Sequence, residues 1–313
     1  MFVIAEFGSV YRKSNDSFSD KDLLIVCERK YVKYYYTKYT EKGYSVSVFT
    51  KNQLQLMRKK GSLFLQHLKL ESNLLVDVES KFELFIKECD LVFPSDEELA
   101  SCKQTIENLH AWPNDFLSLA WKADFLYSSS RDYLIKLLAK NGIIAFGLES
   151  IIEELSLLLS IPIASFNDLK ELRKIKSTYR NGKELPQEEC IKHIINSWYS
   201  LLIKEFRLDF LSLSYSEIMV NRLFSSGYER LRYLEILYMS LVEHGYYHKN
   251  HEEIVRFILK PNLYQSLRFN KLKIIEKYLY EIYDIYIKLE INYNVKPLQS
   301  SILLYERPRK QNS

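Results

Sequence analysis

Glycine and proline are scarce in this chain, and that scarcity limits the folds open to it. Only 8 glycines and 7 prolines occur among 313 residues. Folds built entirely from β-strands need many tight turns, and tight turns depend on both residue types. The bulk of the chain is therefore expected to be helical.

The length favours two packed domains, because a single hydrophobic core rarely extends over so many residues. Hydrophobic residues make up 47% and charged residues 27% of the sequence, which excludes a disordered or collagen-like chain. The formal net charge of +4 is too small to indicate a nucleic-acid partner by itself.

The cysteines and the apolar segments predict a cytoplasmic protein that does not insert into a membrane. The four cysteines contain no Cys-x-x-Cys pair, and the first residues show no basic and then apolar leader. No apolar run reaches ~18 residues, the length that a helix needs to cross a bilayer. We therefore expect reduced thiols and a soluble fold.

Strand and helix patterns alternate at the start of the chain. Apolar or alternating segments predict strands over 2–7, 23–26 and 44–49, and helices are expected over 28–42, 52–60 and 62–71. A strand, a polar turn, a strand, a helix and a strand are the opening of a small α/β unit.

After this unit, apolar residues recur at three- and four-residue spacing, which is typical of helices. The clearest segments are 124–140, 148–159, 188–206, 228–244, 251–259 and 271–291. We therefore predict an α+β fold with a small N-terminal sheet domain over 1–80, a mostly helical domain over 81–296, and a polar basic tail over 297–313.

A pair of aspartates stands where the second strand begins. Asp20 and Asp22 are two residues apart, so in an extended chain both side chains point to the same side and can share a Mg²⁺ ion. Ahead of them, Gly8 permits a tight turn close to an anion, and Ser9 offers a hydroxyl and an N–H group to phosphate oxygens. This order of residues predicts a site for Mg²⁺ or Mn²⁺ and a triphosphate.

Segment 7–26 resembles the signature of the DNA polymerase β-like nucleotidyltransferase superfamily, particularly its minimal nucleotidyltransferase branch. The resemblance is carried by Phe7-Gly8-Ser9, by Arg12 and by Ser19-Asp20-Lys21-Asp22-Leu23-Leu24-Ile25-Val26. It continues through 46–50, which resembles the third strand of that family, and through 61–77, which resembles its closing helix and final strand. In all it covers residues 2 to 80.

The resemblance implies roles for these residues. Gly8 and Ser9 would hold the β- and γ-phosphates with Arg12 nearby, and Asp20 and Asp22 would bind two Mg²⁺ ions. The family usually places a third carboxylate on its third strand, where it binds the catalytic metal and helps to deprotonate the acceptor hydroxyl.

The aligned position on the third strand is Ser47, which cannot act as that base. Asp77 is the preferred substitute, and Glu79 is the other acid considered. The remaining alternatives are that the acceptor is deprotonated in another way, or that transfer is slow or absent.

Two further residues are candidates for the site. Tyr11 lies two residues beyond Ser9, so its hydroxyl could itself accept a nucleotide; the alternative is a ring that packs over the loop. Lys174 belongs to a basic cluster that could contact a triphosphate or an oligonucleotide, or could be a solvated helix face. The cluster comprises Lys170, Arg173, Lys174, Lys176, Arg180 and Lys183.

Lys122 and Arg131 could also reach a nucleotide, or pair with neighbouring aspartates.

Residues 28–44 interleave six tyrosines with Arg29, Lys30, Lys33, Lys38 and Lys42. Aromatic rings among basic side chains could stack bases and neutralise the phosphates of a single strand. On a helix that covers a small sheet, however, several of these rings are expected to belong to the core. The sequence leaves both interpretations open.

The resemblance implies transfer of NMP or dNMP from a nucleoside triphosphate (NTP or dNTP) to an acceptor hydroxyl, with the nucleotide bound between the two domains. The large helical domain looks like those of bacterial anti-phage defence nucleotidyltransferases, which make nucleotide signals or short untemplated oligonucleotides. The alternatives are nucleotidylation of a tyrosine on a partner protein or on the chain itself, modification of a drug or other small molecule, and a degenerate, non-catalytic nucleotide-binding regulator.

Overall fold

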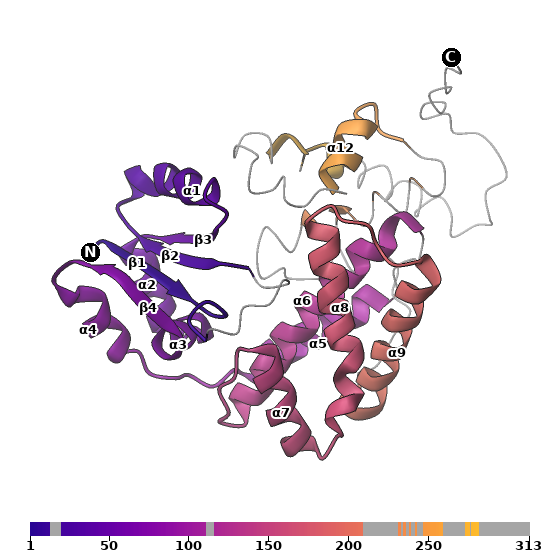
Figure 1. Ribbon diagram of the computed structural model, residues 1–313, viewed down its shortest axis with the longest axis horizontal. Coiled ribbons are helices and arrows are strands. Elements are labelled where there is room, and N and C mark those ends of the chain that lie inside the picture. The colour runs from indigo at the N-terminus through magenta and orange to yellow at the C-terminus, as the bar shows by residue number, and fades with distance from the viewer. Residues whose placement is uncertain are drawn as a thin grey trace. The chain divides into compact units, whose positions relative to one another are not determined.

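The computed structural model describes residues 1–12, 20–110, 116–208, 231–232, 234–235, 238, 242, 247–258, 273–275 and 277–281. It confirms the predicted α+β class: a small sheet lies near the N-terminus, and the remainder is mostly helical (Figure 1). The predicted basic tail over 297–313, and parts of the helices predicted over 228–244 and 271–291, lie outside the described residues.

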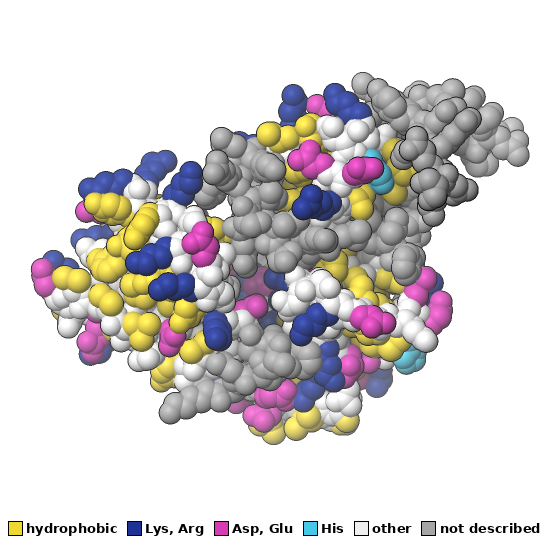
Figure 2. Space-filling model, turned by 45° about the horizontal axis from the view of Figure 1, so that its top comes forward, with side chains coloured by type: hydrophobic (Ala, Val, Ile, Leu, Met, Phe, Trp, Pro, Cys, Tyr) yellow, Lys and Arg dark blue, Asp and Glu magenta, His cyan; other side chains and the backbone are white. Residues whose placement is uncertain are grey.

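The chain forms two compact units rather than dividing once near residue 80. Unit 1 consists of Met1–Ala100 and Arg131–Ile163, and unit 2 consists of Ser101–Ser130 and Ala164–Ser313. The long helix α6, Phe116–Lys140, contributes residues to both units. Charged side chains of both signs are spread over the face shown in Figure 2.

The sheet of unit 1 has four strands in the order β3-β2-β1-β4. The strands are β1 (Val3–Phe7), β2 (Asp22–Val26), β3 (Ser45–Phe49) and β4 (Ser72–Asp77). β1 runs antiparallel to β2 and to β4, whereas β2 and β3 are parallel. The register places Phe7, Asp22, Ser45 and Ser72 side by side, so these residues share one end of the sheet.

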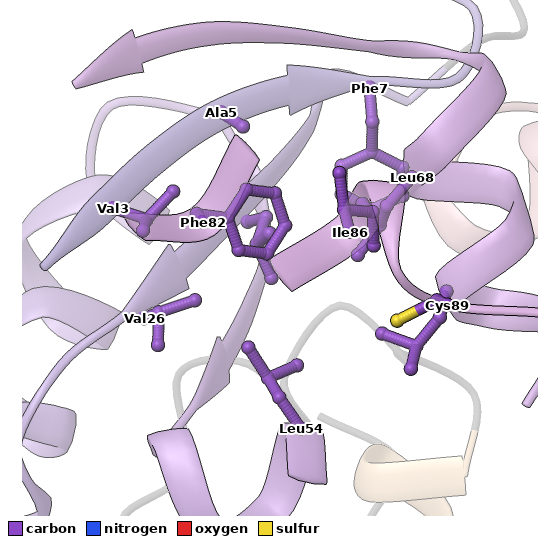
Figure 3. Packing of buried hydrophobic residues seen from close by; sticks show 11 residues of the cluster. Val3, Ala5, Phe7, Val26, Leu54, Leu68, Phe82, Ile86 and Cys89 are labelled. Carbon is purple, nitrogen blue, oxygen red and sulfur yellow. The ribbon is translucent and has the colours of Figure 1, made fainter. Parts of the chain in front are cut away.

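Helices cover both faces of this sheet, and for that reason the central strands β1 and β2 are apolar apart from Glu6 and Asp22. On one face, alternate residues of β1 and β2 pack against α2 (Lys51–Lys59), α3 (Leu63–Leu70) and α4 (Lys81–Lys87), as Figure 3 shows. The buried residues of that face include Val3, Ala5, Phe7, Leu24, Val26, Leu54, Leu68 and Phe82. Asp22 alternates in phase with Leu24, so its side chain belongs to the face that α3 covers.

The opposite face is covered by the short 3-10 helix η1 (Arg29–Tyr31) and by α1 (Val32–Thr40). Ile4, Leu23 and Ile25 of the sheet are buried there, with Val32, Tyr35 and Tyr39 packed against them. Because β2 and β3 are parallel, the chain needs a crossover connection between them, and α1 supplies it.

The other helices agree with the periodicity of the sequence. Predicted and observed ranges coincide for α7 (Leu148–Leu159) and α9 (Glu188–Phe206), whereas α6 begins at Phe116, before its predicted start at residue 124. The remaining described elements are η2 (Val78–Ser80), α5 (Asp96–His110), η3 (Ile163–Phe166), α8 (Asn167–Arg180) and α12 (His251–Ile258).

Among the described helices, none combines the length and apolar character that crossing a bilayer requires.

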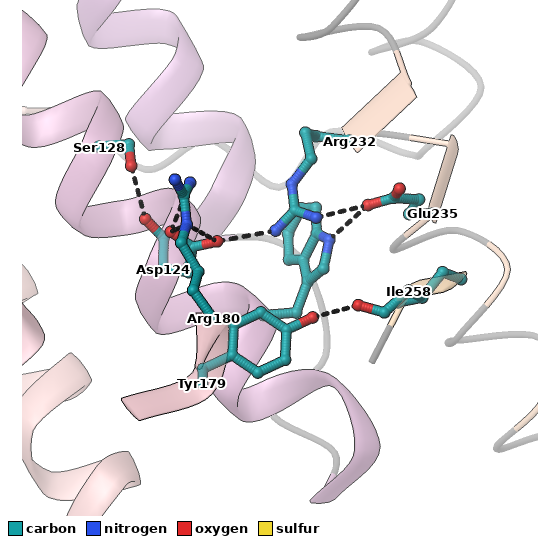
Figure 4. A network of polar contacts seen from close by, with 8 residues as sticks. Asp124, Ser128, Tyr179, Arg180, Arg232, Glu235 and Ile258 are labelled. Atoms are coloured by element: carbon teal, nitrogen blue, oxygen red, sulfur yellow. Dashed lines mark hydrogen bonds and ion pairs between the residues drawn. The ribbon is translucent and has the colours of Figure 1, made fainter. Parts of the chain in front are cut away.

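Unit 2 contains a buried network of charged side chains (Figure 4). Asp124 of α6 pairs with Arg180 at 3.0 Å and with Arg232 at 3.1 Å. Arg232 also lies 2.7 Å from Glu235, which accepts a hydrogen bond of 2.9 Å from the indole N–H of Trp121. Burial raises the pKa of Glu235 to about 7, although Arg232 opposes this shift.

The four cysteines all belong to the described part of the chain, and none forms a disulfide. Cys27, Cys89 and Cys102 are buried, whereas Cys190 on α9 is exposed. The buried thiols behave as small apolar side chains that fill the cores.

Candidate functional site

The two predicted carboxylates lie at the beginning of β2. Asp20 is exposed immediately before the strand, and Asp22 is the first residue of the strand. The pKa of Asp22 is raised to about 6, because burial and the nearby charge of Asp20 both disfavour its ionised form. A hydrogen bond from Ser45 and the proximity of His67 and Arg131 act in the opposite direction.

The chemistry of these donors suits a small divalent cation. Mg²⁺ prefers oxygen ligands and is usually bound through one or two carboxylates together with water and substrate phosphates. A cation shared by Asp20 and Asp22 would offset the repulsion between the two carboxylates. In the described part of the chain, no group of three or more His, Cys, Asp and Glu side chains could hold a metal ion by itself. Oxygens of water and of a bound phosphate would therefore have to complete the coordination.

The Gly8–Ser9 turn follows β1 and lies against Asp22. Gly8 has a φ of +68°, and a Cβ atom placed on it would be 3.3 Å from Oδ2 of Asp22. The N–H of Gly8 donates to the carbonyl oxygen of Glu71 at 3.0 Å. Gly8 therefore allows the turn to approach Asp22 closely, but its N–H group is already used. The Ser9 hydroxyl donates to the backbone carbonyl of Asp20 at 3.2 Å. The structure thus brings Gly8, Ser9, Asp20 and Asp22 together, as the sequence predicts.

Arg12 lies next to this turn in a chain of polar contacts that the sequence analysis did not foresee. Its backbone N–H donates to the carbonyl oxygen of Gly8 at 3.2 Å, and its guanidinium pairs with Glu71. The same carboxylate oxygen of Glu71 lies 2.9 Å from Nε2 of His67. Glu71 therefore links Arg12, the predicted phosphate ligand, to a histidine beside Asp22.

A second segment of unit 1, far along the chain, completes these surroundings. The ring of Phe146 stacks on the imidazole of His67 at 4.3 Å between centroids, with an angle of 20° between the planes. Arg131 donates to the carbonyl oxygen of Phe146 at 2.6 Å and is close enough to Asp22 to lower its pKa. A Cβ atom on Gly147 would be 3.2 Å from Nε of Arg12. Arg131 and Phe146 lie outside the range 1–80 predicted for this domain.

The third strand carries serine at the position beside Asp22, but that serine is Ser45. The parallel register pairs Asp22 with Ser45 and Leu24 with Ser47. Ser47, the position aligned in the sequence analysis, is therefore one step further along the same face. Both positions hold serine, so β3 offers no carboxylate beside Asp22 or one step further along.

Asp77, the predicted substitute for the missing acid, does not join this group. It pairs with Val3, whereas Asp22 pairs with Phe7 at the other end of β1. Four residues of β-strand separate these positions by about 13 Å. The Asp77 carboxylate accepts hydrogen bonds from the backbone N–H groups of Phe82 and Glu83, at 3.1 and 2.9 Å, and so caps the start of α4. Glu79, the other acid considered, follows β4 at the same distant end and pairs with Lys81.

The two remaining candidates differ in their surroundings. The side chain of Tyr11, two residues beyond Ser9, is 46% exposed, so its hydroxyl is accessible. Lys174 lies on α8 of unit 2, where its Nζ is 2.6 Å from a carboxylate oxygen of Glu171. Lys174, the rest of its basic cluster and Lys122 belong to unit 2 rather than unit 1.

No protein-family model, curated protein or solved structure matches the chain. The residues of unit 1 therefore define the chemistry of the site. Its features are two carboxylates at the start of a strand, a glycine–serine turn against one of them, and the cationic side chains of Arg12 and Arg131 nearby. Paired acids with flanking cations suit a ligand that brings both a divalent metal ion and phosphate groups.

Proposed function

We propose that the chain is a metal-dependent nucleotidyltransferase that acts in the cytoplasm on an NTP or dNTP. The observation that supports this proposal most directly is the close approach of the Gly8–Ser9 turn to Asp22, with Asp20 beside it. A side chain at position 8 would occupy the space next to the carboxylate. Glycine at this position therefore lets the turn approach the two acids closely, as a turn that binds the phosphate of a metal-bound nucleotide requires.

In this proposal Asp20 and Asp22 hold Mg²⁺ or Mn²⁺, which when bound neutralises phosphate charge and lowers the pKa of a ligated hydroxyl. The Ser9 hydroxyl and N–H donate to phosphate oxygens, and Arg12 and Arg131 add positive charge. An acceptor hydroxyl attacks the α-phosphorus, the bond from phosphorus to the bridging oxygen breaks, and pyrophosphate leaves. Ser45 cannot take the proton of the acceptor, so we expect transfer to be slow unless the metal or the solvent assists.

For the acceptor, we propose the hydroxyl of another nucleotide, which would give a nucleotide signal or a short untemplated oligonucleotide used in bacterial anti-phage defence. Lys174 is the further phosphate ligand that this scheme takes from the sequence. Transfer to a tyrosine is the second candidate, because the accessible hydroxyl of Tyr11 lies two residues from Ser9. A protein partner could offer a tyrosine in the same way.

A regulator that binds a nucleotide without transferring it is the non-enzymatic alternative. Two observations favour it: β3 carries no carboxylate, with serine at positions 45 and 47, and Glu71 already engages Arg12. Such a protein would bind an NTP in the presence of Mg²⁺ and leave it unchanged.

Incubation of the full-length protein with each α-labelled NTP and dNTP, plus Mg²⁺ or Mn²⁺, distinguishes these functions. Soluble labelled oligonucleotides support the first acceptor, a labelled protein band supports the second, and metal-dependent retention of intact nucleotide supports the regulator. Replacement of both Asp20 and Asp22 by Ala should abolish each signal. Asp77→Ala is the matched control, since it removes a carboxylate at the far end of the sheet and should preserve the signal. If no nucleotide is bound or consumed, the proposal is wrong.

A further inference from the structure

The outer side of η1 and α1 carries tyrosine and lysine side chains that the proposed function does not use. We call this the tyrosine–lysine surface and define it by Lys30, Tyr31, Tyr34, Lys38 and Lys42. It belongs to unit 1, on the helix that covers the sheet face away from Asp22. In Figure 2, dark-blue basic side chains and yellow side chains, which include tyrosine, interleave over this part of unit 1.

The structure separates the tyrosines that build the core from those that face solvent. Tyr35, Tyr39 and Tyr44 pack against the sheet. Tyr31 and Tyr34 are 46% and 57% exposed. The tyrosines of 28–44 therefore fall into two groups. Some rings belong to the core, and others are exposed to a ligand.

The exposed rings are held in place by their neighbours. Tyr35 contacts Tyr31 and Tyr34 edge to face, with centroids 6.3 and 5.1 Å apart, and is itself packed on Phe2 at 5.3 Å. Residues three and four apart lie on the same side of a helix, so Tyr31, Tyr34 and Lys38 follow one another along it. Rings that are already ordered lose less conformational entropy when a ligand stacks on them.

Each exposed ring has a lysine above it. Lys30 Nζ lies 4.9 Å from the centroid of Tyr31, and Lys38 Nζ lies 5.5 Å from that of Tyr34. Lys42 Nζ lies 5.3 Å from the centroid of Tyr39. Exposed cation–π contacts are weak, so these ammonium groups can turn toward an anion and release the ring face.

The charge of the segment favours a polyanionic partner. Residues 28–44 contain five basic side chains and two acidic ones, Glu28 and Glu41. Glu28 is paired with Lys30 at 2.8 Å on the surface, a contact that is readily exchanged in solvent.

We infer that the tyrosine–lysine surface binds single-stranded nucleic acid. Bases stack on Tyr31 and Tyr34, and backbone phosphates pair with Lys30, Lys38 and Lys42. Rings on a convex helix can reach bases only when those bases are unstacked from their neighbours, which excludes a duplex. This binding does not depend on the proposed nucleotidyl transfer, because the surface lies on the other side of the sheet from Asp22.

Fluorescence anisotropy of labelled oligo(dT) and oligo(U) of about 12 nucleotides, titrated with the full-length protein, tests the inference. Three lysine–phosphate contacts predict a plot of log K against log salt concentration with a slope of about −2. The double variant Tyr31→Ala, Tyr34→Ala should bind at least about 30-fold more weakly with the same slope, since only the stacking of two bases is lost. The double variant Lys38→Ala, Lys42→Ala should instead reduce the slope to about −0.7.

The controls assign the binding to this surface. Phe93→Ala with Lys59→Ala removes an exposed ring and an exposed lysine elsewhere in unit 1 and should leave affinity unchanged. The Asp20→Ala, Asp22→Ala chain should also bind as well as the unmodified chain, even if it transfers no nucleotide. Absence of saturable binding, equally tight binding of a duplex, or losses that are the same in the control variants would each overturn the inference.

Discussion

Asp22 combines two conditions that disfavour a charged carboxylate, burial and a neighbouring acid. Its pKa in the folded chain is about 6, against an ordinary value of 3.8. Between these two pH values the folded protein keeps a proton that the unfolded chain releases, so stability falls as the pH rises through this window. We expect Asp22→Asn to raise the free energy of unfolding of the metal-free protein by about 3 kcal/mol above pH 7, and by little below pH 4.

Urea unfolding of both proteins in the presence of a chelator, at several pH values between 4 and 8, measures this difference. Asp20→Asn is the control, because Asp20 is exposed and its removal should have a smaller effect. A constant difference between the Asp22→Asn variant and the unmodified protein across that range would contradict the prediction. Added Mg²⁺ should stabilise only the unmodified protein if the two acids bind it.

Alanine substitutions at Gly8 and Gly43 separate the effect of backbone strain from the effect of crowding against Asp22. Both have positive φ values, +68° and +82°, but a Cβ atom would meet Asp22 at Gly8 and nothing within 4 Å at Gly43. Each Gly→Ala change should cost about 1 kcal/mol of stability through the backbone. Only Gly8→Ala should also weaken binding of an NTP with Mg²⁺, measured by calorimetric titration. Equal binding by the two variants would mean that the turn does not border the ligand.

At this scale, the sequence predicts the local part of the candidate site well. Gly8, Ser9, Asp20 and Asp22 are joined by one strand pair, so their order along the chain is enough to bring them together. His67, Arg131 and Phe146 come from other elements, and their approach depends on how helices pack. No local pattern around Phe146 marks it as a neighbour of His67.

At the scale of the elements, the stability of helix α4 depends on Asp77. The carboxylate caps the helix through the N–H groups of Phe82 and Glu83. Asp77→Ala should therefore lower the free energy of unfolding by about 1 kcal/mol, as the loss of an N-terminal cap does. Asp77→Asn retains an acceptor oxygen and should lose less. Thermal unfolding monitored by circular dichroism gives both values, and a loss of nucleotide binding in Asp77→Ala without a loss of stability would contradict the assignment.

The strands β1 and β2 were predictable because their buried apolar residues leave a clear pattern, and β3 because its residues alternate, whereas their register was not. The pairing of Asp22 with Ser45 could not be predicted, because a shift of two residues keeps the same face and leaves no signature in the sequence. Asp77 was misassigned for a related reason. The Asp77 carboxylate can cap α4 only because the chain turns over Val78–Ser80. In that turn Glu79 and Ser80 adopt left-handed conformations, which their residue types do not predict.

For the whole molecule, periodicity predicts where the helices run but not which unit they join. Helix α6 is uninterrupted from Phe116 to Lys140, yet its residues divide between the two units after Ser130. No glycine or proline marks that point. A boundary inside a regular helix depends on tertiary contacts, and these are absent from local patterns.

The buried charges of unit 2 predict a large effect of one substitution. Arg232 is 1% exposed and pairs with Asp124 and Glu235, so Arg232→Met would leave two buried acids without this partner. We expect the free energy of unfolding to fall by about 3 to 5 kcal/mol. Lys174→Met removes an exposed pair and should cost less than about 1 kcal/mol. Similar losses in the two variants would show that the network is not the source of the stability.

Tryptophan emission during urea unfolding is suited to this comparison. The three tryptophans, Trp112, Trp121 and Trp198, all fall within the ranges of unit 2. The signal therefore reports the unit that contains the network, and Trp121 donates a hydrogen bond to Glu235 itself.

The unequal exposure of the thiols has a practical consequence. Burial raises the pKa of Cys27 and of Cys89, which disfavours the reactive thiolate at neutral pH. A maleimide dye added to the native chain should attach at Cys190 alone, whereas the denatured chain should take up four labels. The wild-type sequence thus already contains a single attachment point for a fluorophore. Energy transfer from a fluorescent nucleotide to that dye would then measure nucleotide binding without any engineered residue.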